Sequence, residues 1–320
     1  MVKSVKDMKV ILVGEPMGLF IAKEEGFLHE VDNFSAAVAG AEYNVAVGLS
    51  RLGHKAAYCT KLGMDPIAQR ILASMAKNKI SDELVMRTDE RLTGFMMKGM
   101  TSSGDPDIAY FRKNSAASTI STHDIDSLDL FGCQWLHVTG IFPAVSASAM
   151  AAVKRLLKRC SDLDMNISFD PNLRPQLWPG EAEMVKSLNS LAECAETVLP
   201  GVGEGKILTG SDDPEQIAAF YHNLGAKNVV VKLGGKGAYY SSADEKGYAE
   251  PFPVKKIVDT VGAGDGFAAG VISALCEGLS LKEAAERGNV IGAIQIANKG
   301  DNEGLPTKRK LASVIEKGTA

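Results

Sequence analysis

Residues 259–270 of this 320-residue chain have the sequence Asp-Thr-Val-Gly-Ala-Gly-Asp-Gly-Phe-Ala-Ala-Gly, in which a glycine-rich bend meets a run of small apolar residues. Glycine adopts backbone conformations that other residues avoid, so Gly262 and Gly264 allow a tight turn in which successive N–H groups converge. Residues 266–276 are small and apolar on all sides, which predicts a buried helix. Because a helix N-terminus has free N–H groups, this segment predicts a binding site for an anion such as a phosphate group.

The acidic residue of this segment, Asp265, is the candidate catalytic residue. A carboxylate at the mouth of an anion site repels phosphate, but it is well placed to accept the proton of a hydroxyl group that attacks the phosphate. The backbone N–H groups of Gly262, Ala263 and Gly264 would then stabilise charge on the transferred group. Spacing alone leaves a second interpretation equally open, in which Asp265 simply caps the helix.

On either side of this segment, short apolar runs alternate with helical patterns, which is typical of a mostly parallel sheet covered by helices on both faces. Asp65-Pro66 and Asp213-Pro214 each place a capping residue before a proline, as at helix starts. We therefore expect an α/β fold in a single domain over residues 1–320. The predicted strands are Val10–Gly14, Ala56–Lys61, Trp135–Thr139, Asn166–Asp170, Thr197–Leu199, Val229–Leu233 and Ala238–Ser241.

Two segments interrupt this alternation, at about residues 16–37 and 91–118. Both alternate polar and apolar residues, and the second contains a predicted turn at residues 103–106. We interpret them as strands that leave the main sheet and form a small lid. The alternative is a pair of long surface loops.

The composition of the chain indicates which partners and which cellular compartment to expect. Hydrophobic residues make up 45% and charged residues 23% of the chain, as in ordinary globular proteins, and the net charge of −4 argues against nucleic acid or an anionic membrane as the main partner. The five cysteines are scattered without a C-x-x-C pair, which favours buried thiols in a reducing compartment. The N-terminal residues do not resemble a secretory signal. We therefore expect a cytoplasmic protein.

The other glycine-rich stretches do not match standard nucleotide-binding loops. Residues 201–206 have Lys206 where a third dinucleotide-binding glycine belongs, and they lack the first glycine and the Ser or Thr of a Walker A loop. Residues 232–237 also lack that first glycine, and residues 14–18 after the first strand do not fit a dinucleotide fingerprint. Nucleotide binding therefore cannot be argued from these loops alone.

Two long segments together resemble the signatures of the PfkB, or ribokinase-like, carbohydrate kinases. Residues 259–270 resemble the second signature, and Ala39-Gly40-Ala41-Glu42-Tyr43-Asn44-Val45-Ala46 followed by residues 51–53 resembles the first. The resemblance covers essentially the whole chain. It implies a three-layer sandwich with a mostly parallel central sheet and a β-strand lid, ATP and Mg²⁺ as cofactors, and a homodimer through the lid.

The same resemblance implies roles for residues outside the two signatures. Lys232, Gly234, Gly235 and Gly237 would form the strand and turn beside the nucleotide, and Glu204 would organise Mg²⁺ through water. Gly201 departs from the family, which often has Asn at that position.

Several shorter segments of the chain resemble the corresponding segments of the 2-keto-3-deoxygluconate kinases within this family. They are Tyr110-Phe111-Arg112, Asp170-Pro171-Asn172-Leu173-Arg174 and Gly300-Asp301-Asn302-Glu303-Gly304. They imply transfer of the γ-phosphoryl group of ATP to a small-molecule sugar acid, since two arginines suit a planar carboxylate. Met96 stands where this subgroup has a second pocket tyrosine. The implied substrate-binding residues are Gly40, Asn44, Tyr110, Arg112 and Arg174.

Alternatives remain at this point. Within the kinases, the chain could be a fructokinase or a 5-keto-2-deoxygluconate kinase. From other classes, an NAD-dependent dehydrogenase is disfavoured by the missing fingerprint after the first strand, and a non-catalytic nucleotide or sugar sensor is disfavoured by the presence of Asp265 and Glu204.

Overall fold

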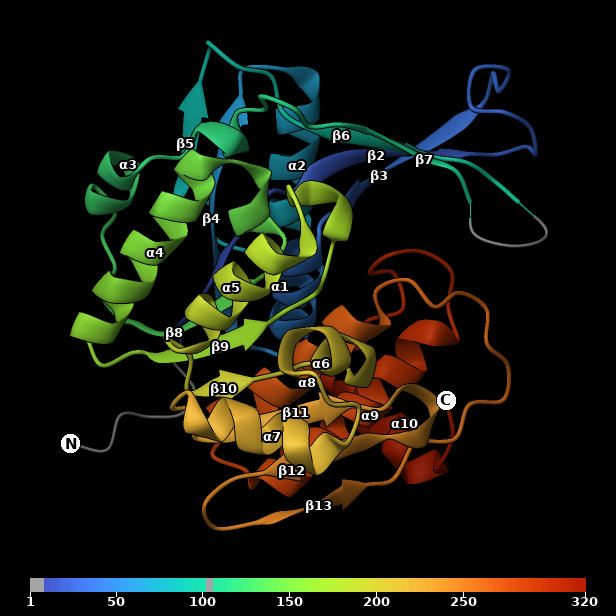
Figure 1. Ribbon diagram of the computed structural model, residues 1–320. Coiled ribbons are helices and arrows are strands. Elements are labelled where there is room, and N and C mark those ends of the chain that lie inside the picture. Colours follow the sequence, from blue (N-terminus) through green and yellow to red (C-terminus); the bar gives the residue numbers. More distant parts are fainter. Residues whose placement is uncertain (1–8, 102–105) are drawn as a thin grey trace.

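The first predicted strand is β1 (Lys9–Val13), which is buried on both faces inside a large sheet. Successive side chains of a strand point to opposite faces. Accordingly Val10 and Leu12 belong to one hydrophobic core, whereas Ile11 and Val13 belong to another on the opposite side. The computed structural model, which describes residues 9–101 and 106–320, therefore has the expected three layers (Figure 1).

The large sheet has nine strands in the order β13-β12-β11-β10-β9-β8-β1-β4-β5. All neighbours from β11 to β5 are parallel, and β12 and β13 are added antiparallel. The mostly parallel sheet predicted from the sequence is thus confirmed. Its further strands are β4 (Lys55–Gly63), β5 (Val85–Thr88), β8 (Cys133–Thr139), β9 (Asn166–Asp170), β10 (Thr197–Val198), β11 (Asn228–Lys232), β12 (Ala238–Ser241) and β13 (Lys246–Ala249).

Helices cover both faces of this sheet (Figure 1). The helices that pack into the core with Val10 and Leu12 are α1 (Ala41–Arg51), α2 (Pro66–Lys77), α8 (Ala263–Cys276), α9 (Leu281–Ile296) and α10 (Lys308–Lys317). Those that pack into the core with Ile11 and Val13 are α3 (Thr122–Asp126), α4 (Ala147–Asp162), α5 (Glu181–Ala192), α6 (Val202–Thr209) and α7 (Pro214–Asn223). Asp65 and Asp213 cap α2 and α7 as predicted, through bonds to the N–H groups of Ala68 and Glu215.

The two interrupting segments form a second sheet and not surface loops. It contains β2 (Met17–Ala22), β3 (Phe34–Ala39), β6 (Phe95–Lys98) and β7 (Ile108–Phe111), in the order β3-β2-β6-β7. In Figure 1 this sheet projects away from the main body. We call these four strands the lid. Residues 103–105 of the predicted turn lie outside the described residues.

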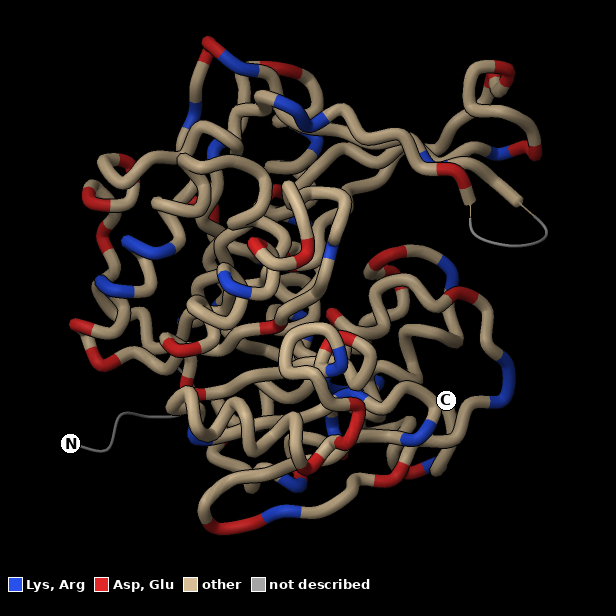
Figure 2. The backbone as a smooth tube through the Cα atoms, in the orientation of Figure 1, with Lys and Arg blue, Asp and Glu red and all other residues tan. Residues whose placement is uncertain are grey.

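Lys, Arg, Asp and Glu residues are interspersed along both halves of the chain (Figure 2). Within residues 9–101 and 106–320, no helix is both long and apolar enough to cross a lipid bilayer.

Candidate active site

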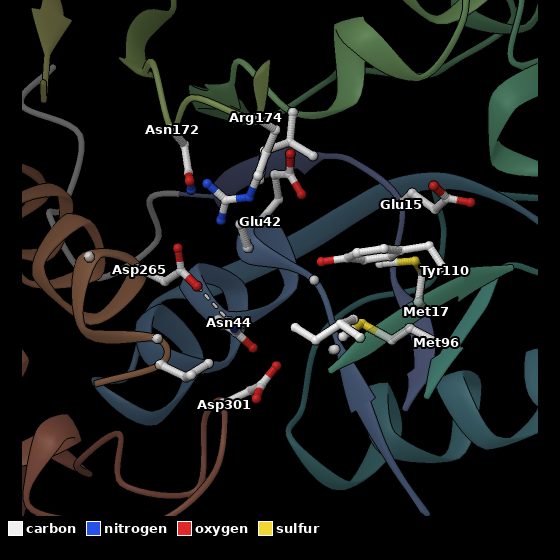
Figure 3. Close-up of a pocket in the computed structure, with 18 of the residues that line it drawn as sticks. Glu15, Met17, Glu42, Asn44, Met96, Tyr110, Asn172, Arg174, Asp265 and Asp301 are labelled. Carbon is white, nitrogen blue, oxygen red and sulfur yellow. Dashed lines mark hydrogen bonds between the residues drawn. The ribbon is translucent and has the colours of Figure 1, made fainter. Parts of the chain in front are cut away.

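A cavity of about 1140 Å³ lies between the lid and the carboxyl ends of the parallel strands (Figure 3). In open α/β sheets, ligands bind at this end of the strands. Asp170 ends β9 and Lys232 ends β11, and both line the cavity. Met17 and Met96 line it from the lid, and the bend before α8 lines it from the opposite side.

The glycine bend has the geometry that an anion site requires. Gly262 adopts φ 75°, and a Cβ atom there would lie 2.1 Å from the carbonyl oxygen of Asp301, so only glycine fits. Within the described residues, the N–H groups of Gly262, Gly264 and Asp265 have no hydrogen-bond partner, whereas that of Ala263 makes a long bond of 3.4 Å to the Thr260 carbonyl oxygen. The start of α8 thus presents free backbone donors to the cavity.

Asp265 lies in the first turn of α8 and lines the cavity, but it does not cap the helix. Its carboxylate accepts a hydrogen bond from Asn44 Nδ2 at 2.8 Å, and α8 begins without a side-chain capping bond (Figure 3). The capping interpretation that spacing left open is therefore wrong.

The surroundings of Asp265 favour its protonated form. Loss of hydration raises the pKa of Asp265 to about 7, and the nearby carboxylates of Asp170 and Glu42 act in the same direction. The bond from Asn44 and the charge of Lys232 oppose this rise in pKa. A carboxylate with a pKa near neutrality is suited to accept and return a proton.

Asn44 is held in place from the other side. Its Oδ1 accepts a bond of 2.9 Å from Asn302 Nδ2, which also donates to the carbonyl oxygen of Val38 at 3.3 Å. Asn44 and Asn302 are both buried. The orientation of Asp265 therefore depends on a chain of amide groups that reaches the loop after α9.

The remaining residues predicted to bind substrate all line the same cavity. Gly40 precedes α1 at φ 142°, where any side chain is strained. Tyr110 projects from lid strand β7, and Arg174 lies opposite it above Asp265 (Figure 3). Arg174 donates to the carbonyl oxygen of Leu173 at 2.8 Å and makes no ion pair within the described residues, so its charge is available to a ligand.

Arg112 differs from Arg174, because it already has a buried acidic partner. Its Nε and NH2 groups lie 2.7 and 2.6 Å from Glu15 Oε2, and Ser115 donates to the other oxygen of Glu15. The side chain of Glu15 is 1% exposed. Only the part of the guanidinium that faces away from Glu15 can reach a ligand.

The residues predicted to contact the nucleotide divide into two groups. Lys232 lines the cavity, where its Nζ binds both oxygens of Asp170 at 2.8 and 2.7 Å. Burial alone would lower the pKa of Lys232, but Asp170 and Glu204 raise it, so the side chain stays charged. Gly234, Gly235 and Gly237 follow β11 in a turn and do not line this cavity.

Glu204, predicted to organise the metal, lies in the first turn of α6. Its two oxygens accept bonds from the N–H groups of Gly201 at 2.6 Å and Leu173 at 2.8 Å. Each oxygen keeps a second lone pair for water. Across the described part of the chain, no cluster of three or more His, Cys, Asp or Glu side chains could hold a metal ion directly.

Four acidic residues of the cavity were not predicted as site residues, namely Glu15, Glu42, Asp170 and Asp301. Glu42 accepts a bond of 2.5 Å from Thr139, and burial raises its pKa. Burial likewise raises the pKa of Asp301 to about 6. The available signal was an acidic residue inside an otherwise apolar or glycine-rich segment, which is unusual unless the site uses it.

Comparison with known proteins identifies the family of this chain. Residues 7–308 match the pfkB family of carbohydrate kinases. The 2-dehydro-3-deoxygluconokinase of Bacillus subtilis (strain 168) is 46% identical over 310 residues, which cover 96% of this chain and 95% of that protein.

Solved structures show the same fold. A PfkB protein from Polaromonas sp. JS666 has 43% identity and a TM-score of 0.89, over 96% of this chain and 99% of that one. An E. coli protein provisionally named ribokinase II, in complex with ATP and Mg²⁺, has 26% identity and a TM-score of 0.87, over 97% of this chain and 99% of that one. The protein therefore belongs to the pfkB family of carbohydrate kinases and has the ribokinase-like fold.

Proposed function

We propose that this kinase transfers the γ-phosphoryl group of ATP to the terminal hydroxyl of 2-keto-3-deoxygluconate (2-dehydro-3-deoxygluconate), giving 2-keto-3-deoxy-6-phosphogluconate. The observation that carries the proposal is the position of Asp265, a proton acceptor in the same helical turn as free backbone donors. The 46% identity to a 2-dehydro-3-deoxygluconokinase supports this choice of acceptor.

In the proposed reaction, the acceptor hydroxyl oxygen forms a bond to the γ-phosphorus. The bond from that phosphorus to the β,γ-bridging oxygen breaks, ADP leaves, and the hydroxyl proton passes to Asp265. The free N–H groups of Gly262 and Gly264 stabilise charge on the transferred group, as fixed donors do in phosphoryl transfer. Closure of the lid over the cavity would exclude water as a competing acceptor.

The carboxylate of a sugar acid would bind at Arg174. This guanidinium faces the cavity without an acidic partner among the described residues, and it can hold a carboxylate with two hydrogen bonds. Tyr110 from the lid and Gly40 at the start of α1 would contact the rest of the acceptor.

ATP is the proposed donor, since a relative with 26% identity binds ATP and Mg²⁺. The absence of a direct metal cluster in the described residues fits a Mg²⁺ ion that is bound by phosphates and water. Glu204 would hold one such water. When bound, Mg²⁺ would neutralise charge on the phosphates.

We also propose that the protein forms a homodimer through the lid. Tyr110 faces the cavity, so the next residue, Phe111, points to the other face of the lid and is 50% exposed. Its ring stacks on Phe95 at a centroid distance of 4.5 Å, and Phe95 contacts Phe20 edge-on. A partly exposed aromatic row of this kind is typical of a contact surface. We further propose a cytoplasmic location, because the free cysteines agree with a reducing compartment.

The test is an ADP-release assay with ATP and Mg²⁺ on 2-keto-3-deoxygluconate, 5-keto-2-deoxygluconate, gluconate and fructose. We expect the highest kcat/KM with 2-keto-3-deoxygluconate. Arg174→Ala should raise the KM for the acid by about 10-fold or more, because a charge-assisted bond is lost. Arg155→Ala, which removes an ion pair to Asp126 outside the cavity, is the control. Equal or better turnover of fructose would contradict the proposal.

A further inference from the structure

Gln295 on α9 is a fully buried polar side chain that touches both loops of the active site. Its Nε2 donates to the carbonyl oxygens of Val261 at 3.1 Å and Gly300 at 2.6 Å. Val261 lies directly before the glycine bend, and Gly300 lies directly before Asp301. One amide nitrogen therefore links two segments that are about forty residues apart in the sequence.

These two segments are in contact at other points as well. Asp259 accepts a bond of 3.3 Å from the N–H of Gly300, and Gly262 packs against the carbonyl oxygen of Asp301. Asn302, on the same loop, holds Asn44, which in turn holds Asp265. A shift of the loop after α9 would therefore move both the anion-binding bend and the proton acceptor.

We propose that Gln295 is a positioning residue, which fixes the glycine bend and residues 300–302 relative to each other and so aligns Asp265 with the phosphate-binding donors. The proposal rests on the kinase reaction described above. Gln295 itself does not line the cavity, so it acts through the residues that it holds.

The chemistry of the contact explains why this residue is a glutamine. Both partners are carbonyl oxygens, so the group between them must donate two hydrogen bonds without introducing a buried charge. Oε1 has no partner within the described residues, which shows that the two donor contacts alone orient the amide. A glutamate would repel both carbonyl groups, and a methionine of similar size would leave both without a donor.

The experiment compares the wild-type enzyme with Gln295→Met and with Asn298→Ala. Asn298 follows the same helix, but its Nδ2 donates only to Ile294, in the preceding turn. Each protein is first checked by a thermal melt, so that rates are compared per folded molecule. We expect Gln295→Met to lower kcat with 2-keto-3-deoxygluconate by about 10- to 100-fold, since a misplacement of about 1 Å can cost that much. Asn298→Ala should keep the wild-type kcat.

Ammonium chloride provides a second readout, because ammonium can donate N–H bonds to the two freed carbonyl oxygens. We expect it to restore part of the kcat of Gln295→Ala, whose short side chain leaves room between these oxygens, while tetramethylammonium chloride at equal ionic strength does not. The proposal is overturned if folded Gln295→Met has the wild-type kcat, or if ammonium leaves the reduced kcat of folded Gln295→Ala unchanged. If the wild-type enzyme phosphorylates none of the acceptors, the proposed function has failed instead.

Discussion

Asp265 combines two opposing requirements. In its proposed role it must be ionised to accept a proton, yet its surroundings favour the protonated form, with a pKa of about 7. Burial is the main cause, and the carboxylates of Asp170 and Glu42 add to it. The bond from Asn44 lowers the pKa, so this amide both orients the proposed base and keeps part of it ionised near neutrality.

This balance predicts the pH dependence of the reaction. The ionised fraction of Asp265 falls below its pKa, so kcat/KM should fall on the acidic side with a midpoint near pH 7. Asn44→Ala removes the bond that lowers this pKa, so the midpoint should move to higher pH. Steady-state rates between pH 5 and 9, in buffers of constant ionic strength, measure both profiles. An acidic midpoint that stays fixed in Asn44→Ala would contradict the assignment.

The bend and the position of Asp265 beside it could be predicted from the sequence, because both follow from a local pattern of glycines around one acidic residue. The ion pair between Arg112 and Glu15 could not be predicted. The two residues are 97 positions apart and meet only because β2, β6 and β7 pair side by side in the lid. Whether an arginine is free or paired depends on such distant partners, so the sequence could not show which acid holds Arg112.

At the scale of elements, the start of α8 depends on Gly262. Gly262→Ala adds strain at φ 75° and a clash with the Asp301 carbonyl oxygen, whereas Gly210→Ala at φ 83° meets no atom within 4 Å. Gly210→Ala should lower the free energy of unfolding by about 1 kcal/mol and leave ATP binding unchanged.

Gly262→Ala should cost about 2 kcal/mol or more and weaken ATP binding, because the bend must move. Urea unfolding and calorimetric titration with ATP measure these effects. Equal ATP affinity in the two variants would show that the bend does not contact the phosphates.

The elements themselves were predictable to different degrees. Strands β9 and β12 have the predicted bounds, since buried strands are short apolar runs between polar residues. Strands β5 and β13 were missed. Both lie at the edges of the large sheet, have four residues each and contain exposed charged side chains, so nothing in their composition distinguishes them from loops.

At the scale of the whole molecule, the lid has a cavity face and an outer aromatic face. If the outer face forms the proposed dimer, Phe111→Ser should shift the protein from dimer to monomer in sedimentation velocity. Phe131→Ser, at a residue that is 91% exposed and lies outside the lid, is the control and should leave the dimer intact. A wild-type protein that sediments as a monomer at micromolar concentration would rule out this interface.

The fold places the proposed proton acceptor, Asp265, where it costs stability. In the unfolded chain Asp265 has an ordinary pKa of 3.8, and in the folded protein about 7. Its contribution to stability is therefore present below pH 3.8 and is lost as the pH rises through 7. Asp265→Asn removes the buried charge, so this variant should melt at least about 2 °C above the wild type at pH 8, with a smaller difference at pH 4.

The role of Asp265 is tested most directly by the kcat of Asp265→Asn with 2-keto-3-deoxygluconate and ATP at pH 8, where we expect the variant to be at least as stable as the wild type. We expect a decrease of about 10²- to 10⁴-fold, with ATP still bound, because the attacking hydroxyl loses its proton acceptor. A folded variant with near-normal turnover would contradict this role.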